Sequence, residues 1–340
     1  MGKTAGNITQ RKADHIDLAF ASQAEAALRD TRFYYEPILT GHPLEDTDLS
    51  LTFLGKRLRF PIWVSSMTGG TEAARLINEN LARMCGEFGF GMGLGSCRTL
   101  LENPEMLPDF DMRKWIGPDL PLFANLGIAQ VEKMLTTGTD DKIHDLIAML
   151  QADGLIVHVN PLQEWLQPGG DRIRIAPIES IRTLVERSTY PVIVKEVGQG
   201  MGPESLGKLM SLPLAAIELA GYGGTNFSTL ELLREKDEMK KEQLARLVTV
   251  GHSAEEMIMY INHIVEQSPG SVRCRQVIVS GGLRDFLDGY YHLKKLNLPA
   301  IYGQASGFLK HAQQGYEQLK AFARIQTAGL KLAYTYLRVR

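Results

Sequence analysis

Residues 191–200, PVIVKEVGQG, decide the fold of this chain. A proline opens a short run of Val, Ile and Val, and the run ends in Lys195, Glu196 and a glycine-containing turn. Such a run is too short for a helix and too uniformly apolar for a half-exposed strand, which is typical of a parallel strand buried on both faces. Lys195 and Glu196 are then expected at the carboxyl end of that strand.

Seven more segments of this kind recur along the chain, at 61–66, 90–95, 121–126, 154–160, 214–219, 276–280 and 299–303. Segments with helical periodicity lie between them, such as 71–88 with Ile77, Leu81 and Met84 on one face. Eight alternations predict an α/β fold, a closed (β/α)8 TIM barrel. A doubly wound open sheet is the rival, but the glycine-rich stretch 89–96 belongs to a strand that is followed by the charged run RTLLENPEM, which is not typical of a dinucleotide fingerprint.

The repeat leaves room for additions at both ends and inside the barrel. We expect an N-terminal extension over 1–58, the barrel over 59–325 and a C-terminal helical tail over 326–340. A long insertion, 225–267, separates strands six and seven. Its charged run, REKDEMKKEQLAR, is expected to be a solvated helix face.

Composition excludes several classes of partner. The 340 residues carry 37 Lys and Arg against 39 Asp and Glu, a net charge of -2, so nucleic acid and anionic membranes are not expected as partners. No apolar run approaches about 18 residues, the length of a membrane span, and the N-terminus lacks a signal-peptide pattern. Three cysteines without a CxxC pair indicate a reduced, cytoplasmic protein.

Polar and glycine residues gather where the predicted strands end, which is where active sites of TIM barrels lie. SGGLR (280–284) and GQASG (303–307) provide glycines that let backbone approach a ligand, each just before a helix whose N-terminus attracts anions. The sequence therefore predicts a phosphorylated cofactor at these two strand ends.

Lys195 would be costly at a strand end without an anionic partner. The partner is Glu196, another carboxylate, or the N1/O2 edge of a flavin that becomes anionic on reduction. Thr68, Asn125 and Thr225 suit the polar edge of a flat heterocycle, although each could instead cap a helix.

The segment HVNPLQEW (158–165) is the most distinctive in the chain. Glu164 is a candidate ligand for Mg2+, and Gln163 is expected to orient substrate because an amide is neither acid nor base. His158 is a candidate too, or else a core histidine. The cluster RKADHI (11–16) is either a surface patch or, together with Arg98, a clamp on a diphosphate.

These motifs, RKADHI, MTGG, GSCR, NLG, HVNPLQE, VKE, GGTNF and SGGLR, occur in an order that resembles the type 2 isopentenyl diphosphate isomerases over residues 11–306. The resemblance implies an FMN-binding barrel that needs Mg2+ and has its flavin reduced by NADPH. It implies interconversion of isopentenyl and dimethylallyl diphosphate in isoprenoid biosynthesis by a homotetramer or homo-octamer. Cys97, Asp14 and Ala220 depart from the family's usual Gln, Glu and Ser.

The resemblance also assigns residues to roles. The implied FMN contacts are Ser66, Met67, Thr68, Ser96, Asn125, Lys195, Thr225, Gly281, Gly282, Gln304 and Ala305. The implied substrate contacts are Arg11, Lys12, His15, Arg98, His158, Asn160 and Gln163. Glu164 would bind Mg2+, and the implied catalytic residues are Gln163, His158 and Lys195.

Three other functions remain open from the residues alone. An FMN-dependent 2-hydroxyacid oxidase or dehydrogenase needs a histidine base near strand seven, and SGGLR supplies none. A flavoprotein without turnover would bind FMN and show no activity. A phosphosugar enzyme of the same fold would be colourless.

Overall fold

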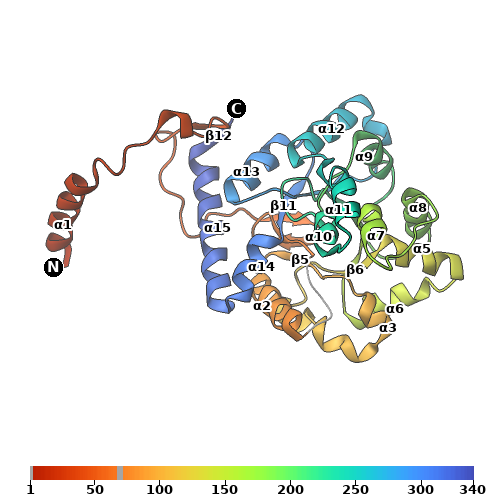
Figure 1. Cartoon of the computed structure of the whole chain (residues 1–340). Coiled ribbons are helices and arrows are strands. Elements are labelled where there is room, and N and C mark those ends of the chain that lie inside the picture. The colour runs from red at the N-terminus through yellow and green to blue at the C-terminus, as the bar shows by residue number, and fades with distance from the viewer. Residues whose placement is uncertain (1–2, 67–71) are drawn as a thin grey trace.

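Eight parallel strands close into a barrel in the computed structural model, which describes residues 3–66 and 72–340. The barrel order is β10-β11-β4-β5-β6-β7-β8-β9, which confirms the predicted TIM barrel (Figure 1). Each barrel strand lies within or overlaps one predicted segment. The strands are β4 (Ile62–Val64), β5 (Gly91–Gly93), β6 (Leu122–Gly127), β7 (Gly154–His158), β8 (Val192–Lys195), β9 (Ala216–Glu218), β10 (Val277–Ser280) and β11 (Ala300–Gln304).

The strands form because their apolar side chains are buried on both faces, against the barrel interior and the outer helices. Their register brings polar strand ends together. His158 on β7 lies opposite Lys195 on β8, and Lys195 lies opposite Glu218 on β9. Three ionisable residues therefore stand in a row at one end of the barrel.

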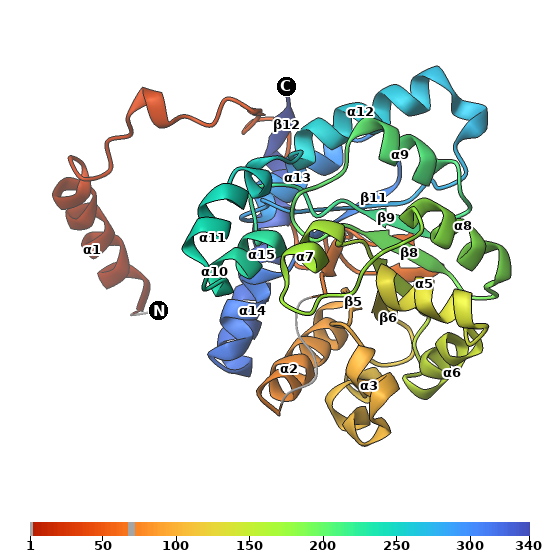
Figure 2. The same ribbon diagram turned by 45° about the vertical axis from the view of Figure 1, so that its right-hand side comes forward.

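Helices surround the barrel on its outer side (Figures 1 and 2). Their local sequence signals are ordinary ones: Ser253 and Glu256 form a capping box on α12, and α5 ends at Gly138 in the left-handed region. The longer ones are α2 (Glu72–Phe88), α5 (Ile128–Thr137), α6 (Asp141–Met149), α8 (Pro177–Arg187), α9 (Pro203–Met210), α12 (Ala254–Gln267), α13 (Phe286–Lys295), α14 (Ser306–Gln313) and α15 (Tyr316–Tyr336).

Shorter helices occupy the connections. They are α3 (Arg98–Glu102), α4 (Arg113–Ile116), α7 (Pro161–Leu166), α10 (Phe227–Arg234) and α11 (Glu238–Leu244), with one-turn 3-10 helices η1 (Ala26–Leu28), η3 (Leu247–Thr249) and η4 (Pro269–Ser271) and the longer η2 (Pro104–Asp109). Helix α11, in the charged run of the insertion, has no buried residue, which confirms a solvated helix there. No helix in the described ranges has the length and apolar character needed to cross a membrane.

A segment of the N-terminal extension pairs with the C-terminal segment outside the barrel. Strand β1 (Phe33–Tyr35) pairs antiparallel with β12 (Leu337–Val339), and β2 (Leu51–Phe53) forms a hairpin with β3 (Lys56–Leu58). Arg32, next to β1, donates a hydrogen bond from Nη1 to Asp288 Oδ1 at 2.8 Å. Helix α1 (Lys3–Leu18) precedes this ribbon and lies apart from the barrel in both views (Figures 1 and 2).

Candidate active site

Two adjoining cavities open at the carboxyl end of the barrel strands. The larger, 330 Å³, we call the glycine pocket because Gly198, Gly223, Gly224, Gly281, Gly282 and Gly303 are among its walls. The smaller, 140 Å³, we call the histidine pocket, with His158, Asn125 and Gln163 in its walls. Ser66, Lys195, Val197 and Phe227 line both, so the two cavities form one site with a shared wall.

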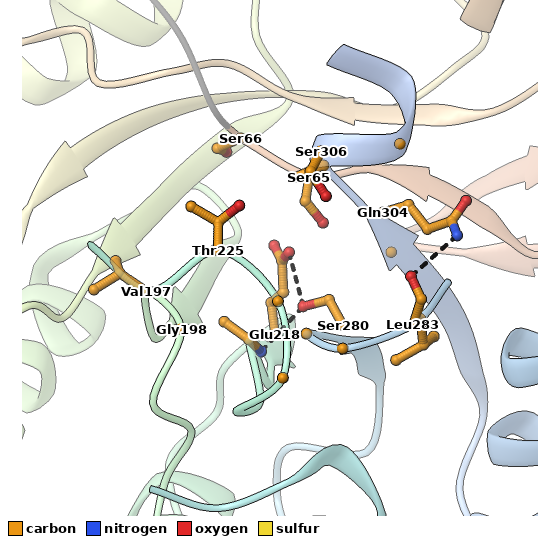
Figure 3. Close-up of a pocket in the computed structure, with 18 of the residues that line it drawn as sticks. Ser65, Ser66, Val197, Gly198, Glu218, Thr225, Ser280, Leu283, Gln304 and Ser306 are labelled. Carbon is orange, nitrogen blue, oxygen red and sulfur yellow. Dashed lines mark hydrogen bonds between the residues drawn. The ribbon is translucent and has the colours of Figure 1, made fainter. Parts of the chain in front are cut away.

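The glycine pocket is shaped by backbone packed against backbone. Gly281 has φ +91°, and a Cβ built on it would lie 2.0 Å from the Gly221 nitrogen. A Cβ on Gly224 would lie 3.0 Å from the Gly282 nitrogen, so the turns after β9 and β10 touch directly. The first residues of α14 close the pocket on another side (Figure 3). Glycine turns beside a helix N-terminus are a setting for a phosphate group, as the sequence predicted.

Several buried polar atoms of this pocket have no partner among the described residues. They are Ser65 Oγ, Ser66 Oγ, Gln304 Oε1 and Glu218 Oε2. The other ends of two of these side chains are held: Gln304 Nε2 donates to the Leu283 carbonyl at 3.3 Å, and Ser280 Oγ donates to Glu218 Oε1 at 3.1 Å (Figure 3). Unpartnered buried polar atoms are costly, so the pocket fits a ligand with many hydrogen-bonding groups.

The histidine pocket is shaped by side chains that fix one another. Asn125 Nδ2 donates to the Leu94 carbonyl at 3.0 Å, which leaves Asn125 Oδ1 to accept the bond from His158 Nδ1 at 2.8 Å. His158 Nδ1 therefore carries the proton, and Nε2 is an acceptor. Burial, together with a smaller effect of the nearby Lys195 ammonium, lowers the pKa of His158 to about 3. His158 is thus a neutral hydrogen-bond acceptor at physiological pH.

Lys195 stands between the two pockets without a carboxylate partner. Its Nζ donates to the backbone carbonyl of Glu196 at 2.7 Å. The Glu196 carboxylate turns elsewhere, because it accepts the N–H groups of Gly198, Gln199 and Gly200 at 2.6 to 2.8 Å. Glu196 therefore forms no salt bridge with Lys195, and its carboxylate and the ammonium attract each other only at longer range. Within the described ranges no ion pair involves Lys195, so its positive charge is available to a ligand.

Helix α7 presents three linked polar side chains. Pro161 begins the helix, and Asn160 before it donates from Nδ2 to Gln163 Oε1 and to Glu164 Oε1, both at 3.1 Å. Gln163 Nε2 in turn faces Glu231 Oε1 at 3.5 Å. The amide of Gln163 therefore has a defined orientation, with its oxygen toward Asn160 and its nitrogen toward Glu231.

Glu231 was missed by the sequence reasoning, although it is buried and contacts a predicted site residue. It belongs to α10, inside the insertion between strands six and seven, whose charged run was interpreted as a solvated surface. A signal was present: Glu231 follows Phe227 by four residues, which puts a carboxylate on the buried face of an amphipathic helix.

The remaining predicted residues are spread more widely. Ser96 lines the histidine pocket, and Thr225 and Ala305 line the glycine pocket. Arg98 lies in a neighbouring depression, where it pairs with Glu102 at 3.1 Å and Asp171 at 2.7 Å. Arg11, Lys12 and His15 lie on α1, which stands apart from the barrel in Figure 2. Met67 and Thr68 lie outside the described residues.

A metal ion would find one candidate carboxylate here. No cluster of three His, Cys, Asp or Glu side chains that could hold a metal exists within residues 10–66 and 74–340. Glu164 is buried, with each oxygen accepting one hydrogen bond, from Asn160 and from the Asp171 N–H. One remaining lone pair on each oxygen fits a cation such as Mg2+, which keeps several waters and takes its other ligands from phosphate groups.

Curated proteins of similar sequence carry one name. A Nostoc protein named isopentenyl-diphosphate delta-isomerase is 36% identical over 325 residues, which cover 94% of this chain and 88% of that protein. Proteins of the same name are 33% identical in Rickettsia peacockii, over 96% and 92% of the two chains, and 35% identical in Synechocystis, over 92% and 88%. No family model matches the chain.

Solved structures of similar fold are flavoenzymes. A flavocytochrome b2 variant with sulfite bound superposes with a TM-score of 0.62 at 17% identity, over 89% of this chain and 71% of that one. A mandelate oxidase variant with an FMN adduct gives 0.54 at 14%, over 91% and 88%. At such identity the likeness shows a shared fold and nothing finer.

Proposed function

The chain belongs to the isopentenyl-diphosphate delta-isomerase family, and from this premise we propose that it interconverts isopentenyl and dimethylallyl diphosphate as a type 2 enzyme, with reduced FMN and Mg2+. The observation that carries the proposal is the pair of adjoining pockets. One is a backbone cradle with unpartnered buried polar atoms, and the other is a small polar site that contains no ready acid or base.

The glycine pocket fits FMN by the nature of its walls. Backbone N–H groups of the glycine turns and of the start of α14 suit the phosphate, and the unpartnered hydroxyl and amide groups suit the polar atoms of the ring and ribityl chain. Reduced FMN would supply the acid–base group that moves a proton between two carbon atoms of the substrate. The residues proposed to hold it are Ser66, Met67, Thr68, Ser96, Asn125, Lys195, Thr225, Gly281, Gly282, Gln304 and Ala305.

The chain's own residues prepare the site for that chemistry. Lys195 stabilises negative charge at the junction of the two pockets, because its ammonium forms no salt bridge among the described residues. His158 offers a neutral acceptor, Nε2, because burial and the nearby Lys195 ammonium lower its pKa and keep the imidazole unprotonated. Gln163 orients the substrate through a hydrogen-bonded amide, and Val197 and Phe227 provide apolar walls for an isoprene unit.

Glu231 extends this network to a carboxylate. It lies behind Gln163, and Gln163 is the only side chain of the histidine pocket that bridges to it in the described hydrogen bonds. We include Glu231 as a positioning residue, because its carboxylate accepts the Gln163 N–H and so fixes which face of that amide the substrate meets.

The diphosphate and its metal complete the proposal. Arg98, Asn160 and the α1 residues Arg11, Lys12 and His15 would bind the diphosphate, and Glu164 would give Mg2+ its protein oxygen. NADPH as the flavin reductant, a homotetramer or homo-octamer, a cytoplasmic location and a place in isoprenoid biosynthesis belong to the same proposal.

An FMN-dependent 2-hydroxyacid oxidase or dehydrogenase is the second candidate, since the structural neighbours include such flavoenzymes. That chemistry needs a histidine base with a pKa near neutrality. The histidine lining the described pockets is His158, whose pKa is lowered to about 3, and the loop after β10 contains Leu283 and Arg284 but no histidine. The site therefore favours the isomerase.

The test is isomerisation of isopentenyl diphosphate by the FMN-loaded protein under anaerobic conditions with Mg2+. We expect many turnovers after a single reduction by dithionite or NADPH, and deuterium from solvent in the methyl group of the product. Gln163→Ala should slow the reaction without loss of bound flavin. Stoichiometric NADPH consumption per product, or no isomerisation with fully reduced FMN, would refute the isomerase.

A further inference from the structure

Asp171 occupies the point at which several groups of the proposed substrate site converge. It lies in the loop 167–176 between α7 and α8. Its Oδ2 accepts hydrogen bonds from Arg98 Nη1 at 2.7 Å and from Gln130 Nε2 at 2.9 Å. Its own N–H donates to Glu164 Oε2 at 2.8 Å. One residue thus contacts both the cation assigned to the diphosphate and the carboxylate assigned to Mg2+.

This convergence lies beside the histidine pocket. A Cβ built on Gly127 would lie 2.3 Å from Gln130 Oε1 and 2.9 Å from His158 Nε2, so the two side chains flank the same backbone position. Arg98 also follows Ser96, which lines that pocket, by two residues. An anion that entered from the histidine pocket would meet the donors that Asp171 now holds.

We propose that Asp171 is an internal counter-anion that competes with the diphosphate of the substrate for Arg98 and Gln130. The inference rests on the proposed function, which assigns Arg98 to the diphosphate. The exchange conserves hydrogen bonds, because a phosphate oxygen takes the place of the Asp171 carboxylate as the acceptor from Arg98 and Gln130. It favours the substrate, since a diphosphate carries more charge than a carboxylate and accepts stronger charge-assisted bonds. Asp171 and Arg98 are 42% and 46% exposed, so the pair is weak enough to yield.

The competition gives the residue a role in specificity and turnover. A weak monoanion must displace Asp171 before it can occupy Arg98, so it gains little. When a diphosphate leaves, Asp171 returns to Arg98 and opposes rebinding.

The loop has a second anchor, which provides a matched control. The Glu132 carboxylate accepts the N–H groups of Arg174 and Ile175 at 3.0 to 3.1 Å. Among the described residues, Glu132 forms no hydrogen bond or ion pair with Arg98, Gln130 or Glu164. Glu132→Gln therefore loosens the same loop and leaves the anion on Arg98 in place.

The first measurement is calorimetric binding of inorganic pyrophosphate with Mg2+ to the FMN-loaded enzyme. Asp171→Asn should tighten binding about two- to fivefold, the factor that an exposed ion pair represents. Glu132→Gln should leave the Kd unchanged. Unchanged or weaker binding by Asp171→Asn would show that the residue only orders the loop, and would overturn the proposal.

The second measurement uses the wild-type protein and so does not depend on the folding of a variant. Hydrogen–deuterium exchange of the 167–176 loop should become faster when pyrophosphate and Mg2+ saturate the enzyme, because Asp171 leaves its partners. Unchanged or slower exchange would overturn the proposal.

Arg98→Gln separates this inference from the proposed function. If that variant binds pyrophosphate as well as the wild type, the competition at Arg98 is refuted even where isomerisation is intact. If Asp171→Asn tightens binding but the wild type never isomerises isopentenyl diphosphate, the competition stands and the proposed function fails.

Discussion

The two pockets at the mouth of the barrel are built from different parts of the protein. The glycine pocket uses backbone, with turns so close that a single Cβ at Gly281 or Gly224 would meet another peptide unit. The histidine pocket uses side chains that orient one another, from the Leu94 carbonyl through Asn125 to His158. The glycine pocket should therefore be most sensitive to substitutions that add atoms, and the histidine pocket to substitutions that remove a hydrogen-bond partner.

The largest effect is expected for Gly281→Ala in the glycine pocket. Its φ of +91° and a Cβ 2.0 Å from the Gly221 nitrogen should cost more than about 3 kcal/mol of unfolding free energy and abolish flavin binding. Urea unfolding and the flavin absorbance of the purified protein are the measurements. The control is Gly138→Ala, with φ +68° and open space, which should cost about 1–2 kcal/mol and retain flavin. Equal effects of the two variants would contradict the backbone cradle.

Lys195→Met tests the boundary between the two pockets. The variant keeps the aliphatic stem but removes the cation, so isomerisation should fall by about 100-fold or more. Reduced flavin should also become harder to form, which an anaerobic reductive titration measures. Lys208→Met, which removes an exposed lysine on α9, should change neither property. Normal reduction and activity in Lys195→Met would remove Lys195 from the site.

Glu164→Gln tests the side-chain network beside the histidine pocket. A neutral amide is a poor ligand for a hard cation, so the Mg2+ concentration for half-maximal activity should rise about tenfold. The matched control is Glu132→Gln, which replaces another buried carboxylate that accepts backbone N–H groups of the same loop. A rise of the same size in both variants would mean that loop order, and not metal binding, sets the requirement.

His158→Asn should have the smallest effect on the stability of the fold at neutral pH, and its signature lies in acid. The folded pKa of His158 is about 3 against an ordinary 6.5, so between these values only the unfolded chain binds the proton. The wild type should therefore lose up to about 1.4 kcal/mol of stability per pH unit as the pH falls below 6.5.

The measurement is urea unfolding of the wild type and His158→Asn from pH 7 to pH 4.5. The stability difference between the two should shrink, or change sign, as the pH falls. His263→Asn, at an exposed site on α12, serves as the control and should follow the wild type. A constant difference between wild type and His158→Asn would contradict a buried neutral imidazole.

The same contrast explains how far the sequence could predict the site. The glycine pocket was predictable, because glycines after a buried apolar run and before a helix leave few alternatives, as at Gly281 and Gly282. The eight barrel strands were predictable for the same reason, since their apolar runs are short, uniform and regularly spaced. In these places the structure depends on backbone geometry, which local sequence controls.

The partners of the side chains were less accessible. The sequence predicted that Lys195 lies at a strand end. It did not predict that the Lys195 ammonium would donate to the Glu196 carbonyl while the Glu196 carboxylate accepts three backbone N–H groups. Glu231 and Asp171 come from an insertion and a loop whose conformations depend on distant contacts. Side-chain networks follow from tertiary packing: the spacing of Phe227 and Glu231 indicates a buried carboxylate, but it does not indicate which side chain that carboxylate will contact.

The β1–β12 ribbon has a consequence for the basic cluster on α1. Pairing of Phe33–Tyr35 with the chain's other end fixes the root of the N-terminal extension against the barrel. Residues 19–32, which are largely exposed, connect α1 to this ribbon. A flexible linker of that length has a root-mean-square end-to-end distance of about 20 Å. Because of this tether, the effective concentration of Arg11, Lys12 and His15 around an anion within its reach is on the order of millimolar. In the proposed function their charges would therefore be supplied without a preformed wall, and a diphosphate would gather them instead of fitting between them.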